Sequence, residues 1–407
     1  MSPITKSLPR AEFISLMAML MATIAFSLDA MLPSMPYMIE DLSPPTPESI
    51  QLVLTVFVLG MGLGTFIVGP VSDAVGRRPV IVYGAVIYCV SAFFAAISTS
   101  FEAILIARLI QGLGAAGPRV VALAVVRDLY KGREMAQITS LIIMVFTLVP
   151  VFAPTLGAAI SITLSWRAVF AACALFSIIS IAWYLLRQPE TLPPEARRPL
   201  RVKALLSATK EIALHTHVRR ATIVLALCFG NLFIVLSASQ MVFDQSLGLG
   251  DTFHLWFGMI AVFAVGGPIL NSKIVLHMGM RRVVLGALLG LLVLTGLYLV
   301  ALETGFIPPN VIWAYVLWQI VVFFSAGMLM GNLNAVALTP MGHIAGMAAT
   351  IVSAVATVGS MAIAMPLAAR FDGTQIPIVE GIFGCTVIAF LLATRLEDDQ
   401  VVGEAKA

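Results

Sequence analysis

The chain has 407 residues, of which 60% are hydrophobic and only 11% are charged, and its formal net charge is +3. Soluble domains carry about 25% charged residues, so this composition excludes a water-soluble globular protein and indicates a surface that faces lipid. The basic residues lie in short segments between long apolar runs, which fits membrane topology and excludes a nucleic-acid-binding surface.

The apolar runs predict an all-α membrane protein, because a bilayer core about 30 Å thick needs roughly 20 apolar residues per helical span. Only helices and closed barrels satisfy the backbone in lipid, and these runs do not alternate as barrel strands do. The first run is too long for a signal peptide and is interpreted as a retained helix. We predict twelve transmembrane helices, near residues 12–32, 50–70, 79–98, 103–126, 138–162, 167–187, 221–243, 254–276, 282–302, 311–338, 345–369 and 376–395.

The Lys and Arg residues predict the orientation in the membrane. Of the 24, two (Arg108 and Arg119) lie inside the fourth predicted helix and two (Arg167 and Arg370) lie on the face opposite the N-terminus. The remaining 20 lie on the side of the N-terminus, whereas the predicted outer loop at 33–49 has none. Because cytoplasmic loops are enriched in Lys and Arg, we expect both termini, including Lys6 and Lys406, to be cytoplasmic.

The longest polar segment divides the chain into two halves. Residues 188–220 contain four prolines and a basic cluster, and we predict a cytoplasmic linker between six-helix bundles at 1–187 and 221–407. Its stretch VKALLSATKEIAL is amphipathic and is expected to lie along the membrane surface. The halves also resemble each other, because GPVSDAVGRRPV after the second helix and KIVLHMGMRRVV after the eighth both place Gly and paired Arg at a turn. Two parallel six-helix pseudo-repeats indicate a secondary transporter with its substrate site between the halves.

Two charged residues lie within predicted helices of the first half. A charge at a helix centre costs about 2.5–3.5 kcal/mol, so such residues usually face a cavity and a partner. Counting along the helices, Arg108 lies roughly 8 Å below the outer surface, and Asp29, four residues before Pro33, lies roughly 6 Å deep. Because the two depths match, we predict that Asp29 and Arg108 share a cavity and form an ion pair, direct or through water.

Arg119 lies on the same face of the fourth helix as Arg108, about 16 Å away. Pro118 immediately before it is expected to kink or loosen the helix. Two interpretations remain open for Arg119. Its guanidinium either reaches the inner headgroups or lines the inner cavity, where a cation would favour anionic or zwitterionic substrates.

Two motifs of the first half belong to a recognisable pattern. In GPVSDAVGRRPV, Gly76 permits a tight turn, and Asp73 ends the second helix where a carboxylate is favoured near a neighbouring helix N-terminus. In RLIQGLGAAG, which begins at Arg108, glycines and alanines form a small-residue face for close helix packing. These motifs resemble the major facilitator superfamily, specifically its drug/proton antiporters of the Bcr/CflA type, and the resemblance covers nearly the whole chain.

The resemblance implies roles for particular residues. The loop motif would form a cytoplasmic latch that holds the two halves in the outward-facing state, its arginine pairing with an acid at the end of the fourth helix. The latch residues that match are Asp73, Gly76, Arg77, Arg78 and Asp128.

The family's helix-one acid, in its D-x-x-L-P context, matches Asp29, and its helix-four arginine matches Arg108. The resemblance therefore implies that these two residues couple transport to protons. Some relatives have a second acid earlier in the first helix, where this chain has Met21, so a mechanism that needs two helix-one carboxylates is not expected.

The fifth predicted helix contains LVPVFAPTLGAAI, which resembles the antiporter signature G-x-x-x-G-P-x-x-G-G. Pro154 and Gly157 match the signature, while Pro150, Ala153 and Ala158 replace glycines. The kink made by prolines and small residues is retained, and the signature's link to export is weakened.

Amide side chains lie on the apolar helices of the second half. Each of them could simply form an interhelical hydrogen bond, worth about 0.6 kcal/mol on average. The alternative is a substrate cavity, for which Asn332 and Asn334, near glycines of the tenth helix, are the better candidates. The six amides are Asn231, Gln240, Asn271, Gln319, Asn332 and Asn334.

The motifs of enzymes and ATP-driven pumps are missing from the sequence. There is no H-E-x-x-H, nucleophile elbow or phosphate-binding loop, and the four cysteines show no metal-binding or disulfide spacing. We expect a monomeric, proton-coupled exporter of drugs or other small molecules in the cell inner membrane, with no metal, no cofactor and no nucleic-acid partner. The alternatives are a proton symporter that imports an organic acid or sugar, and a receptor or sensor without transport.

Overall fold

The computed structural model describes residues 8–197, 200 and 202–397, and every element in these ranges is helical. Within these ranges, ten helical stretches are long and apolar enough to cross a membrane. The chain forms two compact units, Met1–Ser43 with Leu59–Val202 and Pro44–Val58 with Lys203–Ala407. Lys6 and Lys406, which contributed to the predicted orientation, lie outside the described residues.

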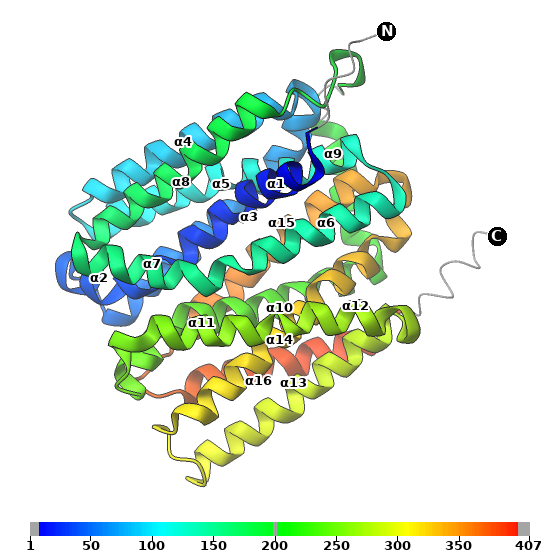
Figure 1. The fold of residues 1–407 in the computed structure, drawn as a ribbon. Helices are drawn as coiled ribbons and strands as arrows, with labels where there is room; N and C mark the ends of the chain where they lie inside the picture. Colours follow the sequence, from blue (N-terminus) through cyan, green and yellow to red (C-terminus); the bar gives the residue numbers. More distant parts are fainter. Residues whose placement is uncertain (1–7, 198–199, 201, 398–407) are drawn as a thin grey trace. The chain divides into compact units, whose positions relative to one another are not determined.

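The first unit is a bundle of long apolar helices in which α1, α4, α5 and α8 pack against one another (Figure 1). A core of buried apolar side chains, including Phe13, Ile81 and Val125, joins them. Its elements are α1 (Arg10–Asp29), η1 (Leu32–Ser34), α2 (Met35–Leu42), α3 (Leu52–Val75, from Leu59 onward), α4 (Arg77–Ile97), α5 (Phe101–Leu129), α6 (Gly132–Thr147), α7 (Val149–Thr163), α8 (Trp166–Arg187) and η3 (Pro194–Ala196).

The second unit is centred on α10, against which α14, α15 and α16 pack (Figure 1). Its elements are η2 (Pro47–Gln51) with the first turns of α3, then α9 (Val202–Leu214), α10 (Thr216–Met241), η4 (Val242–Ser246), η5 (Gly250–Thr252), α11 (Phe253–Ala264), α12 (Gly266–Met278), α13 (Met280–Glu303), α14 (Ile312–Leu338), η6 (Thr339–Ile344), α15 (Ala345–Ala368) and α16 (Ile376–Ala393). The amphipathic stretch VKALLSATKEIAL folds as α9.

The two related turns seen in the sequence have the same backbone geometry. Gly76, between α3 and α4, has a φ of 110°, and Gly279, between α12 and α13, has a φ of 80°. Only glycine adopts this region without strain, which explains why both copies of the turn contain it.

Glycines also allow equivalent helix contacts in the two units. A Cβ atom on Gly60 of α3 would lie 2.1 Å from the carbonyl oxygen of Leu109 on α5, and one on Gly267 of α12 would lie 2.2 Å from that of Phe324 on α14. Backbone therefore touches backbone at both sites, as small residues permit in membrane helices. The internal repeat is thus present in packing as well as in the turns.

Several predicted boundaries were wrong. The outer segment 33–49 is largely helical, since α2 and η2 fill most of it. The fifth predicted helix is divided into α6 and α7 at Leu148, two residues before Pro150. The eighth is divided into α11 and α12 at Val265, three residues before Pro268. A proline lacks the N–H that would continue the helical hydrogen bonds, so both breaks have the same cause.

Candidate functional site

Arg108 is the largest fully buried side chain of the described residues, with 0% of its surface exposed. Its Nη1 donates to Oε1 of Gln111 at 2.9 Å, and its Nη2 donates to the carbonyl oxygen of Ser27 at 3.3 Å. The guanidinium carbon also lies 5.7 Å from the ring centre of Phe170. The charge is therefore held inside the first unit by α1, α5 and α8, as expected for an intramembrane cation.

Hydroxyl groups from α1 and from one further helix, α4, complete this buried polar cluster. The hydroxyls of Ser27 on α1 and Tyr88 on α4 are hydrogen-bonded to each other, and both residues are buried. Ser27 therefore contacts Tyr88 with its side chain and Arg108 with its backbone. This arrangement fixes the end of α1 against α4 and α5.

Asp29 lies two residues after Ser27 and is 4% exposed. Among the described residues, no hydrogen bond or ion pair joins its carboxylate to Arg108. The two residues nevertheless belong to the same buried region, because Arg108 bonds to the backbone of the last turn of α1. Their ion pair, direct or through water, stays a prediction.

The first helical path ends later than predicted. The sequence placed Asp29 about 6 Å from the outer end of the first helix, but the helical path continues through η1 and α2 to Leu42. Asp29 therefore lies inside the candidate membrane-crossing stretch Arg10–Leu42, 13 residues before its end. Pro33 does not end this span, because it occupies the first turn of a new helical segment, where its missing N–H has no cost.

A close contact of α7 with α1 lies directly beside Asp29. A Cβ atom on Gly157 would lie 2.0 Å from the carbonyl oxygen of Ala30. Four residues further along the chain in each case, the hydroxyls of Ser34 in η1 and Ser161 in α7 are hydrogen-bonded at 2.8 Å. Glycine at position 157 is thus required by backbone contact, and α7 supports the part of α1 that carries Asp29.

The prolines of the fifth-helix motif have different positions. Pro150 lies in the first turn of α7, and Pro154 lies inside the helix. The break between α6 and α7 therefore falls at Leu148, the first residue of the motif. Gly157, one turn after Pro154, is the residue that meets α1.

Arg119 lies half-buried on α5, and its Nη1 donates to the sulfur of Met61 on α3 at 3.4 Å. A thioether is a weak acceptor and carries no charge. Pro118 lies inside α5, which continues without a break to Leu129.

The loop between α3 and α4 is organised around Arg77. Its guanidinium donates to Asp73 at 2.6 Å, to Asp128 at 2.9 and 3.3 Å, and to the hydroxyl of Ser72 at 2.8 Å. Arg77 is buried, while the Asp73 carboxylate is about half exposed. A guanidinium is planar and has several N–H donors, so it can bond to three side chains at once. Arg77 thereby connects the ends of α3, α4 and α5. Arg78 instead donates to the carbonyl oxygen of Leu185 at 2.7 Å.

Glu190 is a member of this loop site that the sequence reasoning missed. Its two carboxylate oxygens accept the backbone N–H groups of Arg77 and Arg78, at 3.0 and 2.9 Å. A carboxylate at these free donors is favoured by the helix dipole at the start of α4. A Cβ atom on Gly76 would lie 2.8 Å from the same carboxylate, so the glycine also makes room for Glu190. The available signal was an acid three residues after the end of α8, ahead of the basic residues that follow.

The amides of the second unit are mostly engaged in hydrogen bonds. Asn332 donates to Asn271 at 2.7 Å, and Asn231 donates to Thr386 at 3.0 Å, so each connects two helices. Asn334 donates to a backbone carbonyl of its own helix at 3.2 Å.

Two further amides are buried close to these. The side chain of Gln319 donates to Ser239. Within the described residues, the side-chain oxygens of Gln240, Asn231 and Gln319 are buried without a hydrogen-bond partner. These oxygens can therefore accept a hydrogen bond from a molecule that reaches them.

Groups with metal-binding or disulfide chemistry are not assembled in the described part of the chain. No cluster of three or more His, Cys, Asp or Glu side chains could hold a metal ion there. The four cysteines are free thiols, and Cys173, Cys228 and Cys385 are buried.

Comparisons with known proteins agree with this arrangement. A model of the Major Facilitator Superfamily matches residues 15–365. The Bicyclomycin resistance protein homolog of Haemophilus influenzae is 29% identical over 371 residues, which cover 90% of this chain and 91% of that protein. The Chloramphenicol resistance protein of Pseudomonas aeruginosa is 32% identical over 295 residues, covering 70% and 68% of the two chains.

A solved structure supports the fold. The crystal structure of a D-xylose-proton symporter matches with a TM-score of 0.73 over 97% of this chain and 99% of that one, at 16% identity. At this identity, the match supports the fold and not the substrate. The helical units, the turn motifs and the family model together establish that this chain belongs to the major facilitator superfamily and is similar to its bicyclomycin and chloramphenicol resistance members.

Proposed function

We propose that this protein is a proton-coupled secondary transporter that exports drugs or other small molecules across the inner membrane by alternating access. Members of the superfamily are transporters rather than enzymes, and two relatives are named for resistance to bicyclomycin and chloramphenicol. The observation that carries the proposal is the buried Asp29, beside a buried Arg108 that bonds to the same helix end. We further propose that it acts as a monomer without a cofactor.

The proposal includes twelve membrane spans. The stretch Ile312–Ala368 is 57 residues long, and a single span needs about 20, so α14 and α15 count as two. The helices α6 and α7 together supply one more, although each is short by itself. Adding these two spans to the ten apolar stretches gives twelve spans, six in each half of the chain.

With twelve spans, both termini lie on one side, and the Lys and Arg distribution supports the cytoplasm. A fluorescent protein that matures only in the cytoplasm, fused after Ala407, is expected to fluoresce. Alkaline phosphatase at the same position is expected to stay inactive. Active phosphatase at this position would contradict the orientation.

The coupling mechanism follows from charge compensation. With Asp29 ionised, its charge compensates that of Arg108, and the pair can remain buried. A proton that reaches a carboxylate oxygen of Asp29 from outside removes the negative charge and weakens the pairing. We propose that this step releases the substrate and lets the two units change their arrangement. Arg108 stays charged throughout, because a guanidinium does not titrate in this range.

The candidate substrate contacts remain Arg119, Asn231, Gln240, Asn332 and Asn334. Support comes from the free side-chain oxygens of Asn231 and Gln240 and from the weak thioether partner of Arg119. The latch residues Asp73, Gly76, Arg77, Arg78 and Asp128 are proposed to stabilise the outward-facing state.

The second candidate function is proton symport of an organic acid or sugar. It is favoured by the cation at Arg119 and by Ala153 and Ala158 in place of signature glycines. Deleting the gene separates the two functions in cells: loss of an exporter raises drug accumulation, while loss of an importer lowers uptake of its solute.

Purified protein in liposomes tests the direction of coupling directly. With an acidic lumen, an antiporter is expected to accumulate labelled chloramphenicol while protons leave, and a protonophore should abolish the accumulation. Accumulation of an organic acid or sugar that requires an acidic exterior would instead establish symport. If neither gradient drives a diverse panel of drugs and organic anions, the transport proposal fails.

A further inference from the structure

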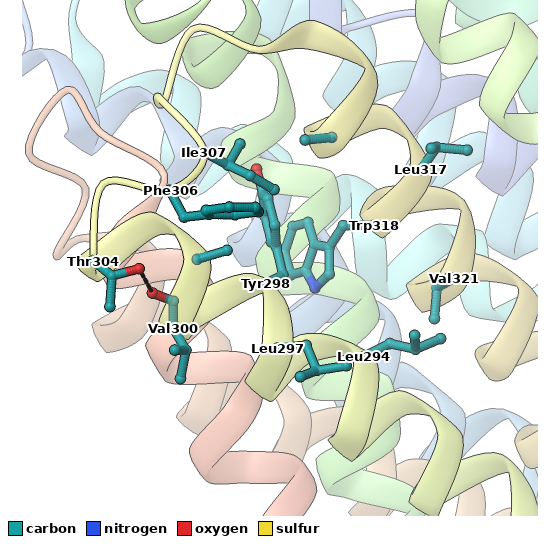
Figure 2. Close-up of a pocket in the computed structure, with 12 residues that line it drawn as sticks. Leu294, Leu297, Tyr298, Val300, Thr304, Phe306, Ile307, Leu317, Trp318 and Val321 are labelled. Atoms are coloured by element: carbon teal, nitrogen blue, oxygen red, sulfur yellow. Dashed lines mark hydrogen bonds between the residues drawn. The ribbon is translucent and has the colours of Figure 1, made fainter.

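An apolar groove lies between α13 and α14 in the second unit. Its volume is about 530 Å³, which is in the range of small-molecule sites. Figure 2 shows Tyr298 and Trp318 on its walls, with Phe306 of the connecting turn at one end and Val321 towards the other. From Ala314 to Val321 the groove extends roughly 10 Å along α14.

The polar atoms of this groove are already used within the protein. The hydroxyl of Tyr298 donates to the side chain of Gln375, and Nε1 of Trp318 donates to the hydroxyl of Thr295 at 3.2 Å. The hydroxyl of Thr304 donates to a carbonyl of its own helix at 2.7 Å. A sugar or a polar drug would leave its own polar groups unpaired here, so the groove suits a hydrocarbon ligand.

The groove is open to the region that hydrocarbon occupies. Both α13 and α14 belong to membrane-crossing stretches, and Leu297 and Leu317, on facing walls, are 63% and 60% exposed. The rings of Trp256 and Trp313 pack 5.2 Å apart at the end of α14 nearest the turn. Such aromatic residues mark the membrane–water interface, so the groove begins near the interface and continues into the hydrocarbon core.

A second groove of about 450 Å³ occupies the equivalent place in the first unit. It lies between α4 and α5, next to their connecting turn, and its walls include Phe94, Ile97, Ile106 and Ile110. The hydroxyl of Ser98 in this groove is also bonded internally, to the carbonyl oxygen of Phe94 at 2.7 Å. The third and fourth spans of each half thus diverge in the same way at the same end. Recurrence in both halves of the repeat argues that the groove is part of the fold.

We propose that each groove binds one acyl chain of a membrane phospholipid. An acyl chain gains no hydrophobic free energy when it moves from the bilayer into the groove, because both surroundings are apolar. Binding is instead driven by dispersion contacts between the acyl chain and the fixed side chains of the groove walls. The α13–α14 groove is the tighter site, because the rings of Tyr298, Phe306 and Trp318 provide a large rigid surface. The proposal does not depend on substrate or on the direction of transport.

Photo-crosslinking in liposomes tests this site. The full-length protein is reconstituted with phosphatidylethanolamine that carries a diazirine in its acyl chain, and labelled residues are mapped by mass spectrometry. Labelling is expected to concentrate on the groove walls. Ala301→Trp fills the α13–α14 groove, so it should abolish the concentrated labelling of that groove's walls. The labelling of α4 and α5 should be unchanged. Leu289→Trp on a lipid-facing part of α13 outside the groove is the matched control and should change neither.

Labelling in simple proportion to surface exposure would overturn the proposal, as would an unchanged pattern in Ala301→Trp. Gel filtration and thermal unfolding show whether each variant is folded. If Ala301→Trp is misfolded, Ala103→Trp makes the same test in the α4–α5 groove, which Ala103 also lines. Native mass spectrometry gives a second measurement, in which the filled variant is expected to retain fewer phospholipids than the control.

Discussion

Replacing Asp29 with asparagine is expected to reduce pH-gradient-driven drug accumulation to the level of empty liposomes. Asparagine has nearly the same shape but cannot exchange a proton, so the coupling step is removed while the packing of α1 is retained. Because the neutral amide removes the negative charge that is proposed to compensate the buried Arg108, thermal stability is expected to be lower. Exchange of labelled for unlabelled drug without a gradient should continue, because it needs no net proton movement.

The matched control for this variant is Asp41→Asn on the same membrane-crossing stretch. Asp41 lies in α2, and its carboxylate accepts from Nη1 of Arg167 at 2.5 Å and from Nε1 of Trp166 at 2.8 Å. Both partners of that ion pair are partly exposed, so its loss should have little effect on stability or coupling. Undiminished gradient-driven accumulation by Asp29→Asn would remove Asp29 from the coupling role.

Replacing Arg77 with alanine is expected to destabilise the protein by about 3 kcal/mol, the lower end of the range for breaking a buried ion pair. Asp128, whose side chain is 17% exposed, would lose its cation, whereas Asp73 can be solvated because it is half exposed. Thermal unfolding of the purified protein measures the effect. Arg77→Lys should be intermediate, because an ammonium keeps the charge but cannot reproduce the forked hydrogen bonds.

Arg78→Ala is the control at the adjacent position in the same motif. Arg78 carries the same charge, but its described hydrogen bond from Nη2 goes to a backbone carbonyl, which predicts a loss of about 1 kcal/mol. Equal unfolding temperatures for the alanine variants of Arg77 and Arg78 would contradict the central role of Arg77. Gradient-driven transport should fall in Arg77→Ala even in preparations that remain folded, if the loop also stabilises one transport state.

Residues with a strong local requirement could be recognised without coordinates. Gly76 has a positive φ that glycine adopts without strain, and Pro150 lies at a break between two helices. Arg108 is costly in a membrane wherever it lies, so a buried, bonded environment was expected. Gln111 could also have been predicted as a partner of Arg108, because residues three apart on a helix are neighbours.

Other features depend on contacts between distant segments. The helical continuation from Leu32 to Leu42 was missed because Pro33 was read as the end of the first helix, although it lies in the first turn of a further helical segment. Tyr88 and Ser27 meet across 61 positions of sequence, and an apolar run with one tyrosine carries no signal for that contact. Glu190 was missed because its partners are backbone N–H groups, which have no side-chain signature.

The sequence by itself determined that the chain crosses a membrane as helices in two related halves, because lipid requires apolar side chains and internally satisfied backbone groups along every span. Only the tertiary structure decided which polar groups share a site. Arg108 meets the end of α1, Gly157 meets Ala30, and Glu190 caps α4, and each of these contacts depends on how helices approach one another. Hydrophobic pattern specifies which side chains avoid water but not which helix faces another, since lipid and a neighbouring helix are equally apolar.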